Sequence, residues 1–194
     1  MNYVRTIAVL FILVARINAQ SLDLRLLDRI NSRENPKRDL IFLRITQSAV
    51  PVSFSAPLLM FAAGYNVNDR AAINRSYYVG SSILLTSIIT TSIKFGIQRE
   101  RPFVENDFIC RKCSVGKLSF PSGHTSTVFA TATALSLAYP KWYVVGPSFL
   151  WASAVAYSRM YLGVHYPSDV LGGMVIGIGV SYIMWEVERK LNNL

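Results

Sequence analysis

The chain has 194 residues, of which 52 % are apolar, and its formal net charge is +9 at neutral pH. This length allows one domain or at most two small ones, and the mean hydropathy of +0.32 is higher than in a typical soluble protein. Lysines and arginines are spread between apolar runs and form no basic stripe, which argues against nucleic acid as a partner and favours anionic lipid surfaces and phosphorylated substrates.

The first twenty residues resemble an export signal. Met1 to Arg5 is a short basic start, Thr6 to Ala15 is an apolar core, and Ile17-Asn18-Ala19 fits a cleavage site. The core of about ten residues is too short to cross a membrane comfortably. We therefore expect residues 1–19 to be a signal peptide cleaved after Ala19 or, alternatively, an uncleaved first membrane helix. Residues 20–194 then form the functional domain.

The next segment, Ser21 to Ser32, has leucines and an isoleucine within one helical arc and most of its charges opposite. This pattern predicts a helix lying in the membrane interface, with a short helix packed on the rest of the domain as the alternative. The polar sequence Asn35-Pro36-Lys37-Arg38 then predicts a turn.

Five longer apolar runs follow, most of them close to the roughly 20 residues that a spanning helix needs. They are Ile45–Tyr65, Tyr78–Ile97, Thr125–Tyr139, Trp142–Tyr161 and Ser168–Val187. The run from Thr125 is short and spans only if it begins at Ser122 or Gly123. Small residues inside the runs suit close helix contacts in a bilayer. With no strand-rich region, the sequence predicts an all-α fold, an integral membrane bundle of five to six spanning helices.

Polar motifs lie at the ends of these runs, and both histidines of the chain fall within them. The motifs are Lys94 with Arg101-Pro102, then Pro121-Ser122-Gly123-His124, then a segment from Ser158-Arg159 through His165 to Asp169. Ionisable groups are costly near hydrocarbon and are usually retained there for function. Three cations, two imidazoles and a carboxylate at such positions indicate a site that handles phosphate at a membrane edge.

Alternating spans place all three motifs on one face of the membrane. An exported N-terminus makes that face the outer one, with the linkers Asn66–Tyr77 and Pro140-Lys141 and the tail from Glu188 in the cytoplasm. Together with the small size of the chain, this predicts the cytoplasmic (inner) membrane of a bacterium, with the site at helix ends facing the periplasm or the exterior.

These residues include every group that hydrolysis of a phosphate ester needs. The neutral imidazole of His165 suits the nucleophile if Asp169 holds its other ring nitrogen as a donor, and His124 is then left as the general acid. Positive charge comes from Lys94, Arg101 and Arg159. Ser122 and Gly123 begin a predicted helix, and their backbone N–H groups would point at an anion, as those of helix N-termini do. This scheme requires no metal, and no carboxylate-rich cluster suits magnesium.

The order and spacing of the motifs, from Lys94 to Asp169, resemble the type 2 phosphatidic acid phosphatase family. The resemblance implies a metal-independent membrane lipid phosphatase without cofactor, working through a phosphohistidine. His165 is its nucleophile, His124 the acid and Asp169 the orienting partner; the phosphate cradle is Lys94, Arg101, Ser122, Gly123 and Arg159. Candidate substrates by resemblance are undecaprenyl pyrophosphate, lipid A, phosphatidylglycerophosphate and phosphatidic acid, and the export signal favours the first two.

Other readings of the same motifs remain open. Soluble exported acid phosphatases share them, although the unbroken apolar runs argue against that class. A vanadate-dependent haloperoxidase and a non-catalytic lipid-binding protein are further alternatives. Cys110 and Cys113 lie in the longest loop of the core; they form a local disulfide or stay free thiols, and a zinc site lacks ligands. The sequence makes no prediction about oligomeric state.

Overall fold

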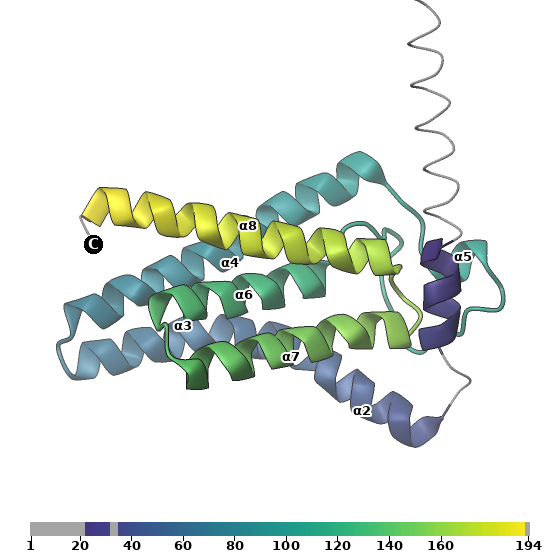
Figure 1. Ribbon diagram of the computed structural model, residues 1–194, viewed down its shortest axis with the longest axis horizontal. Coiled ribbons are helices and arrows are strands. Elements are labelled where there is room, and N and C mark those ends of the chain that lie inside the picture. Colours follow the sequence, from purple (N-terminus) through teal and green to yellow (C-terminus); the bar gives the residue numbers. More distant parts are fainter. Residues whose placement is uncertain (1–21, 32–34, 193–194) are drawn as a thin grey trace, which may run out of the picture.

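A computed structural model describes residues 22–31 and 35–192 of the chain, and every regular element among them is a helix (Figure 1). The all-α prediction is therefore confirmed. The predicted signal peptide or first membrane helix, residues 1–19, lies outside the described residues and stays a prediction.

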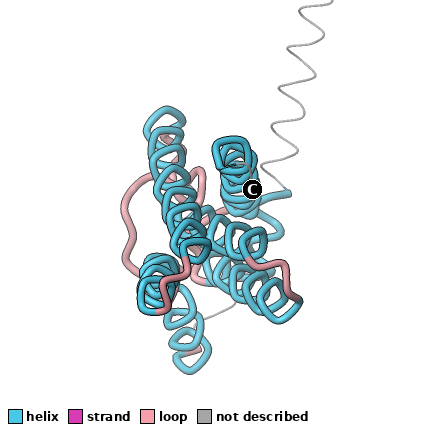
Figure 2. The backbone as a smooth tube through the Cα atoms, turned by 90° about the vertical axis from the view of Figure 1, so that its left-hand side faces the viewer, coloured by secondary structure: helices cyan, strands magenta, loops and turns pink. Residues whose placement is uncertain are grey.

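The described chain opens with a short helix over residues 22–30, and longer helices follow. They are α2 (Pro36–Gln47), α3 (Ala49–Asn66), α4 (Arg70–Ile97), α5 (Pro102–Glu105), α6 (Gly123–Ala138), α7 (Trp142–Tyr161) and α8 (Pro167–Asn192). Figure 1 shows α3, α4, α6, α7 and α8 running lengthwise, with the helix over residues 22–30 and α5 at one end. Figure 2 looks along this bundle and shows its helices nearly end-on.

The core of the bundle is built on α6, which packs against α4, α7 and α8. Most of its side chains are small and buried, so neighbouring helices approach its backbone closely. A Cβ atom at Gly173 of α8 would lie 2.7 Å from the carbonyl oxygen of Ser122. Only glycine therefore allows the first turns of α6 and α8 to meet, and Ser122 there donates its backbone N–H to the Asp169 carbonyl, at 3.0 Å.

Two predicted connections are wrong. The predicted linker Asn66–Tyr77 is mostly helical, because α4 already begins at Arg70, where Asp69 caps the helix by accepting the N–H groups of Ala71 and Ala72. The predicted turn at Asn35 is likewise the start of α2: Asn35 is the N-cap and Pro36 the first helical residue. In both places a polar first turn hid the helix from a search for apolar runs.

Among residues 22–31 and 35–192, three stretches are long and apolar enough to cross a membrane: Pro36–Asn66, Arg70–Glu105 and Pro167–Leu191. The predicted runs Thr125–Tyr139 and Trp142–Tyr161 are the helices α6 and α7, which fall outside that set. The predicted count of five to six spans is therefore not confirmed.

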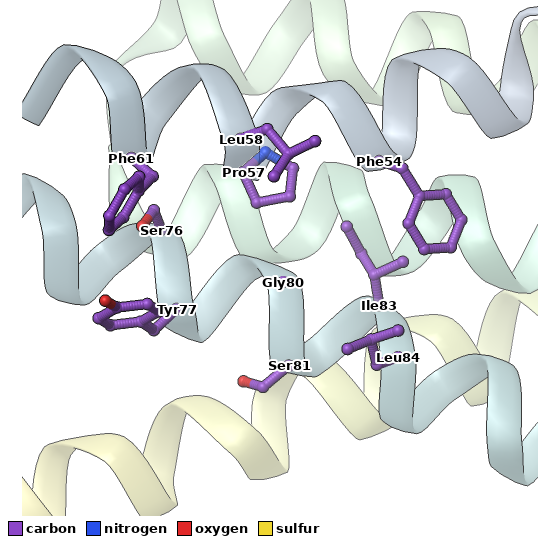
Figure 3. Close-up of a pocket in the computed structure, with 10 residues that line it drawn as sticks. All are labelled: Phe54, Pro57, Leu58, Phe61, Ser76, Tyr77, Gly80, Ser81, Ile83 and Leu84. Carbon is purple, nitrogen blue, oxygen red and sulfur yellow. The ribbon is translucent and has the colours of Figure 1, made fainter.

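Large apolar side chains cover the outside of the long helices, as the surface facing lipid requires. Leu58, Leu150 and Val175 are each about two thirds exposed or more, at 68 %, 74 % and 69 %. A groove of about 480 Å³ runs between α3 and α4, and its lining is mostly apolar, with Ser76 and Ser81 as its hydroxyl side chains besides Tyr77 (Figure 3). Its walls come from the middle of α3 and the first half of α4, away from the polar motifs.

Candidate active site

The three polar motifs meet at one end of the bundle. Lys94 is in the last turn of α4, Ser122 caps α6, Arg159 is in the last turn of α7 and Asp169 is in the first turn of α8. Hydrogen bonds join the motifs directly: Lys94 donates to the carbonyl of Pro121 at 2.8 Å, and Arg101 donates to the His165 ring at 3.2 Å. The three motifs thus lie at one end of the bundle, as their predicted placement on one face of the membrane requires.

His165 and Asp169 form a buried pair: the two residues are 2 % and 0 % exposed, respectively. The Nδ1 atom of His165 lies 3.4 Å from Asp169 Oδ2 and 3.3 Å from the hydroxyl of Ser119. Ser119 in turn donates its hydroxyl hydrogen to Asp169 Oδ2, and the backbone N–H of Tyr166 donates to the same oxygen at 2.9 Å. The imidazole is therefore held against acceptors on its Nδ1 side.

The opposite ring nitrogen of His165 faces a donor. Arg101 Nη1 lies 3.2 Å from His165 Nε2, and a guanidinium group can only donate. The hydrogen bonds on both sides therefore assign the proton to Nδ1 and a lone pair to Nε2. The same Arg101 is fixed by the carbonyl of Val164, at 2.7 Å, and by the carbonyl of Gly116.

Burial keeps the His165 ring neutral. Removal from water lowers its pKa most strongly, and the charges of Arg159 and Arg101 lower it further. The hydrogen bond and charge of Asp169 act in the opposite direction, and the resulting pKa is about 3. A neutral ring with a lone pair on Nε2 is the form in which histidine acts as a nucleophile.

The ammonium group of Lys94 is bound to the protein backbone. It donates to three carbonyl oxygens, those of Leu118 at 3.2 Å, Ser119 at 2.9 Å and Pro121 at 2.8 Å. Lys94 therefore holds the loop that precedes α6, and it places a positive charge beside the start of that helix.

Arg159 is 2 % exposed and is anchored by α2, since its Nη1 donates to Thr46 Oγ1 at 2.7 Å. It also contacts the side chain of Cys113. Its Nε has no hydrogen-bond partner among the described residues, which is rare for a buried guanidinium. A buried donor without a partner is a candidate ligand for an anion.

The start of α6 leaves room for such an anion. A Cβ atom at Gly123 would meet no atom of a neighbouring segment within 4 Å, so there is open space beside this first residue of the helix. His124 follows in the first turn, partly exposed, and lies within electrostatic reach of Arg159, Arg101 and Lys94. Arg159 and Arg101 also act on His165, so the two histidines share their cationic neighbours.

Four side chains of this site were missed in the sequence: Asp23, Thr46, Arg99 and Ser119. Arg99 donates to Asp169 Oδ1 at 2.8 Å and to Asp23 Oδ2 at 2.9 Å. Its position between Lys94 and Arg101 was a signal that could have found it. Asp23 and Thr46 lie outside every motif, and only the fold brings them to the site.

The helix over residues 22–30 packs on the loops of the site. Leu27 is fully buried against Ile109 and Tyr166, whereas Leu22 and Leu26 are 59 % and 40 % exposed. The inner face of this helix therefore fits the alternative prediction, a short helix packed on the rest of the domain. Its exposed leucines could still contact a membrane interface.

The loop before α6 is tied to this helix through Asn31. Asn31 donates its side-chain amide to the Cys110 carbonyl at 3.0 Å and accepts the Cys110 N–H at 2.8 Å. Cys110 and Cys113 are both free thiols in the structure. Within residues 22–31 and 35–192, no group of three or more His, Cys, Asp or Glu side chains is placed to hold a metal ion.

The profile of the PAP2 superfamily matches residues 76–193, more than half of the chain and all of the motifs described above. The chain belongs to the PAP2 superfamily. The family predicted from the three motifs is thus confirmed.

Similar proteins include undecaprenyl-diphosphatases and a lipid A phosphatase. Undecaprenyl-diphosphatase BcrC of Bacillus subtilis is 27 % identical over 160 residues, 82 % of this chain and 80 % of the relative. An undecaprenyl-diphosphatase of Sulfolobus acidocaldarius is 31 % identical over 120 residues, 59 % of this chain. The chain spans 57 % of the Sulfolobus protein's length, and it spans 41 % of a lipid A 4'-phosphatase from Bacteroides thetaiotaomicron.

Solved structures agree in fold over a larger share of the PAP2 chain. LpxE of Aquifex aeolicus is 27 % identical and superimposes with a TM-score of 0.70, covering 85 % of this chain and 95 % of that protein. A transmembrane PAP2-type phosphatidylglycerolphosphate phosphatase of Bacillus subtilis is 22 % identical, with a TM-score of 0.73 over 93 % of this chain and 92 % of that one. The fold is therefore that of a membrane PAP2 protein.

Proposed function

We propose that this PAP2 protein is a membrane lipid phosphatase that cleaves a phosphate ester or diphosphate at His165. The observation that carries the proposal is the buried imidazole whose Nδ1 faces Asp169 and whose Nε2 faces the guanidinium group of Arg101. That arrangement supplies a neutral nucleophile and positive charge at the same point.

In the first step, His165 Nε2 attacks phosphorus and the bond to the leaving oxygen breaks. His124 enters this step as an imidazolium, donates a proton to that oxygen and becomes neutral. The Nδ1 proton of His165 stays hydrogen-bonded beside Asp169, which stabilises the positive phosphohistidine. In the second step, His124 takes a proton from water, whose oxygen attacks phosphorus. The P–N bond breaks, inorganic phosphate leaves and neutral His165 is restored.

The cationic residues stabilise charge on the transferred group. The donors that we assign to the anion are the Nε of Arg159, which has no partner among the described residues, and the backbone N–H of Gly123. Arg101 exchanges its contact with His165 Nε2 for a phosphate oxygen, which frees the lone pair for attack. Lys94 adds charge and keeps the loop before α6 in place.

The proposed substrate is an envelope lipid that carries a phosphate or diphosphate group. Undecaprenyl pyrophosphate and lipid A come first, since related proteins are named as undecaprenyl-diphosphatases and lipid A phosphatases. Phosphatidylglycerophosphate and phosphatidic acid follow. The proposed location is the inner membrane of a bacterium, with the site on the outer side; the signal-like start supports this orientation.

The proposal is tested by phosphate release from purified full-length protein in detergent, with EDTA present, across these four lipid phosphates. We expect turnover of at least one of them that persists in EDTA, and its loss in both His165→Ala and His124→Ala. Asp28→Asn, an exposed change on the helix over residues 22–30, is the matched control and keeps full activity. Equal phosphate release by the wild type and His165→Ala would overturn the proposed mechanism.

A further inference from the structure

Behind the pair of His165 and Asp169 lies a second guanidinium group that belongs to no PAP2 motif described above. Arg99 donates through Nη1 to Asp169 Oδ1 at 2.8 Å and to the hydroxyl of Ser168 at 2.6 Å. Through Nη2 it donates to Asp23 Oδ2 at 2.9 Å. Arg99 thus bridges two carboxylates, one in α8 and one in the helix over residues 22–30.

Asp23 is fixed as firmly as Arg99. It is 7 % exposed, accepts the backbone N–H of Ser168 at 2.8 Å and also accepts the Ser168 hydroxyl. It therefore binds the first turn of α8, where a carboxylate is favoured by the helix dipole. Through Asp23, the N-terminal helix contacts the element that carries Asp169.

The guanidinium of Arg99 is held from a further side by an aromatic ring. It lies 3.9 Å from the ring centre of Tyr166, and the Tyr166 hydroxyl donates to Glu105 at 2.8 Å. Arg99 therefore has a fixed position between Asp23, Asp169 and Tyr166. A side chain with several rotatable bonds is held this way at the expense of its rotamer entropy.

The two oxygens of Asp169 consequently have separate tasks. Oδ1 accepts from Arg99, and Oδ2 accepts from Ser119 and the Tyr166 N–H and faces His165 Nδ1. Asp169 is fully buried, so loss of the Arg99 charge would leave one carboxylate oxygen uncompensated in a low-dielectric site. The carboxylate would then rotate or take up a proton, and either change weakens its bond to Nδ1.

We propose that Arg99 is a positioning residue that sets the orientation and charge of Asp169, and that the helix over residues 22–30 completes the catalytic centre through Asp23. This inference rests on the proposed function of His165 as the nucleophile. It makes the N-terminal helix part of the catalytic centre, because Asp23 and Arg99 connect that helix to the histidine tautomer.

The test combines turnover with ring NMR of His165 in protein carrying ¹⁵N-labelled histidine. Assignment is direct, since the chain has two histidines and His124→Gln leaves one. In the wild type we expect the Nδ1–H tautomer. In Arg99→Gln we expect a mixed tautomer signal and a kcat about 10- to 100-fold lower, the loss typical when the partner that orients a metal-bound histidine is removed. KM should stay within about threefold.

Asp23→Asn is the second variant, and it decides the question if Arg99→Gln does not fold. It should change both readouts in the same direction but less, because Arg99 keeps its bond to Asp169. Asp28→Asn, on the exposed side of the same helix, should change neither. The inference would be overturned if each of these two variants that folds and reaches the membrane kept both the wild-type His165 signal and the wild-type kcat.

The two proposals fail in different ways. Absence of phosphatase activity in the wild type would refute the proposed function, whereas the NMR signal reads the Arg99 network without substrate. A large KM change with unaltered tautomer would assign Arg99 to substrate binding and would also overturn the positioning role.

Discussion

The reactivity of His165 depends on which ring nitrogen carries the proton. Asp169 and Ser119 present acceptors to Nδ1, and Arg101 presents a donor to Nε2, so neighbours on both sides favour the same tautomer. Two independent constraints on one ring leave a single reactive form at the buried site. Single substitutions can therefore separate the orientation of the His165 ring from its charge.

Asp169→Asn should lower kcat strongly while KM changes little. An amide turned toward Nδ1 can donate as well as accept, and it no longer stabilises the positive ring of the phosphohistidine. Loss of the corresponding carboxylate in a catalytic triad lowers the rate on the order of 10⁴-fold. Steady-state kinetics on the best lipid substrate measure this loss, and a fall of less than about tenfold would contradict an orienting role.

His165 should stay neutral well below neutral pH. A free imidazole has a pKa of about 6.5 and is mostly protonated at pH 5. Burial lowers the pKa of His165 to about 3, so its nucleophilic form is kept as the pH falls from 7 to 4.5 and is lost only as the pH approaches 3. The ring ¹⁵N shifts of His165 in His124→Gln should not titrate between pH 8 and 4.5. A midpoint near 6.5 would contradict the buried site.

At the scale of elements, a glycine after α7 controls the direction of the chain into His165. Gly163 has a φ of 70°, and a Cβ atom there would lie 2.8 Å from the Asn31 side chain and would also collide with the Cys110 carbonyl. The turn between α7 and α8 therefore needs glycine, and it sets the position of His165 relative to both helices.

Gly163→Ala should destabilise the protein by about 1–3 kcal/mol, because it adds a strained left-handed residue and a clash with the loop. Thermal unfolding in detergent measures this loss as a lower midpoint temperature. Gly179→Ala is the matched control within α8: a Cβ atom there meets nothing within 4 Å, and alanine favours a helix. Equal midpoints for Gly163→Ala and the wild type would contradict the turn geometry.

The motifs predicted the site better than the apolar runs predicted the elements. His124, His165, Asp169 and Arg159 were found because each lies at the end of an apolar run, where a charge stands out. The start of α4 was missed because its first turns are polar, and a run search begins only at Tyr78. Asp23 was missed because it reaches the site only through tertiary contacts, which no local pattern encodes.

In the whole molecule, apolar side chains cover the long helices and the polar motifs lie together at one end. The same arrangement of helices therefore provides the lipid-facing surface and places the site at an end of the bundle. The turn at residues 67–69 lies between α3 and α4, opposite to the end of α4 that carries Lys94. Asp107, in the loop after α5, belongs to the site end and is exposed.

The proposed orientation predicts which of these points a membrane-impermeant maleimide reaches in intact cells. With Cys110 and Cys113 replaced by serine, Asp107→Cys should be labelled from outside, and Asn68→Cys should be labelled only after permeabilisation. Both positions are exposed, so burial does not decide the result. The reverse pattern would place the site on the cytoplasmic side.

In the proposed mechanism, His165 carries the phosphoryl group between the two chemical steps. To test this role, the protein is mixed with a lipid substrate that carries ³²P in the transferred phosphate, and the reaction is stopped rapidly without acid. Peptide mapping then locates the label. We expect an acid-labile, alkali-stable label on the peptide that contains His165, and no such label in His165→Ala. Label on another residue, or turnover by His165→Ala at the wild-type rate, would contradict it.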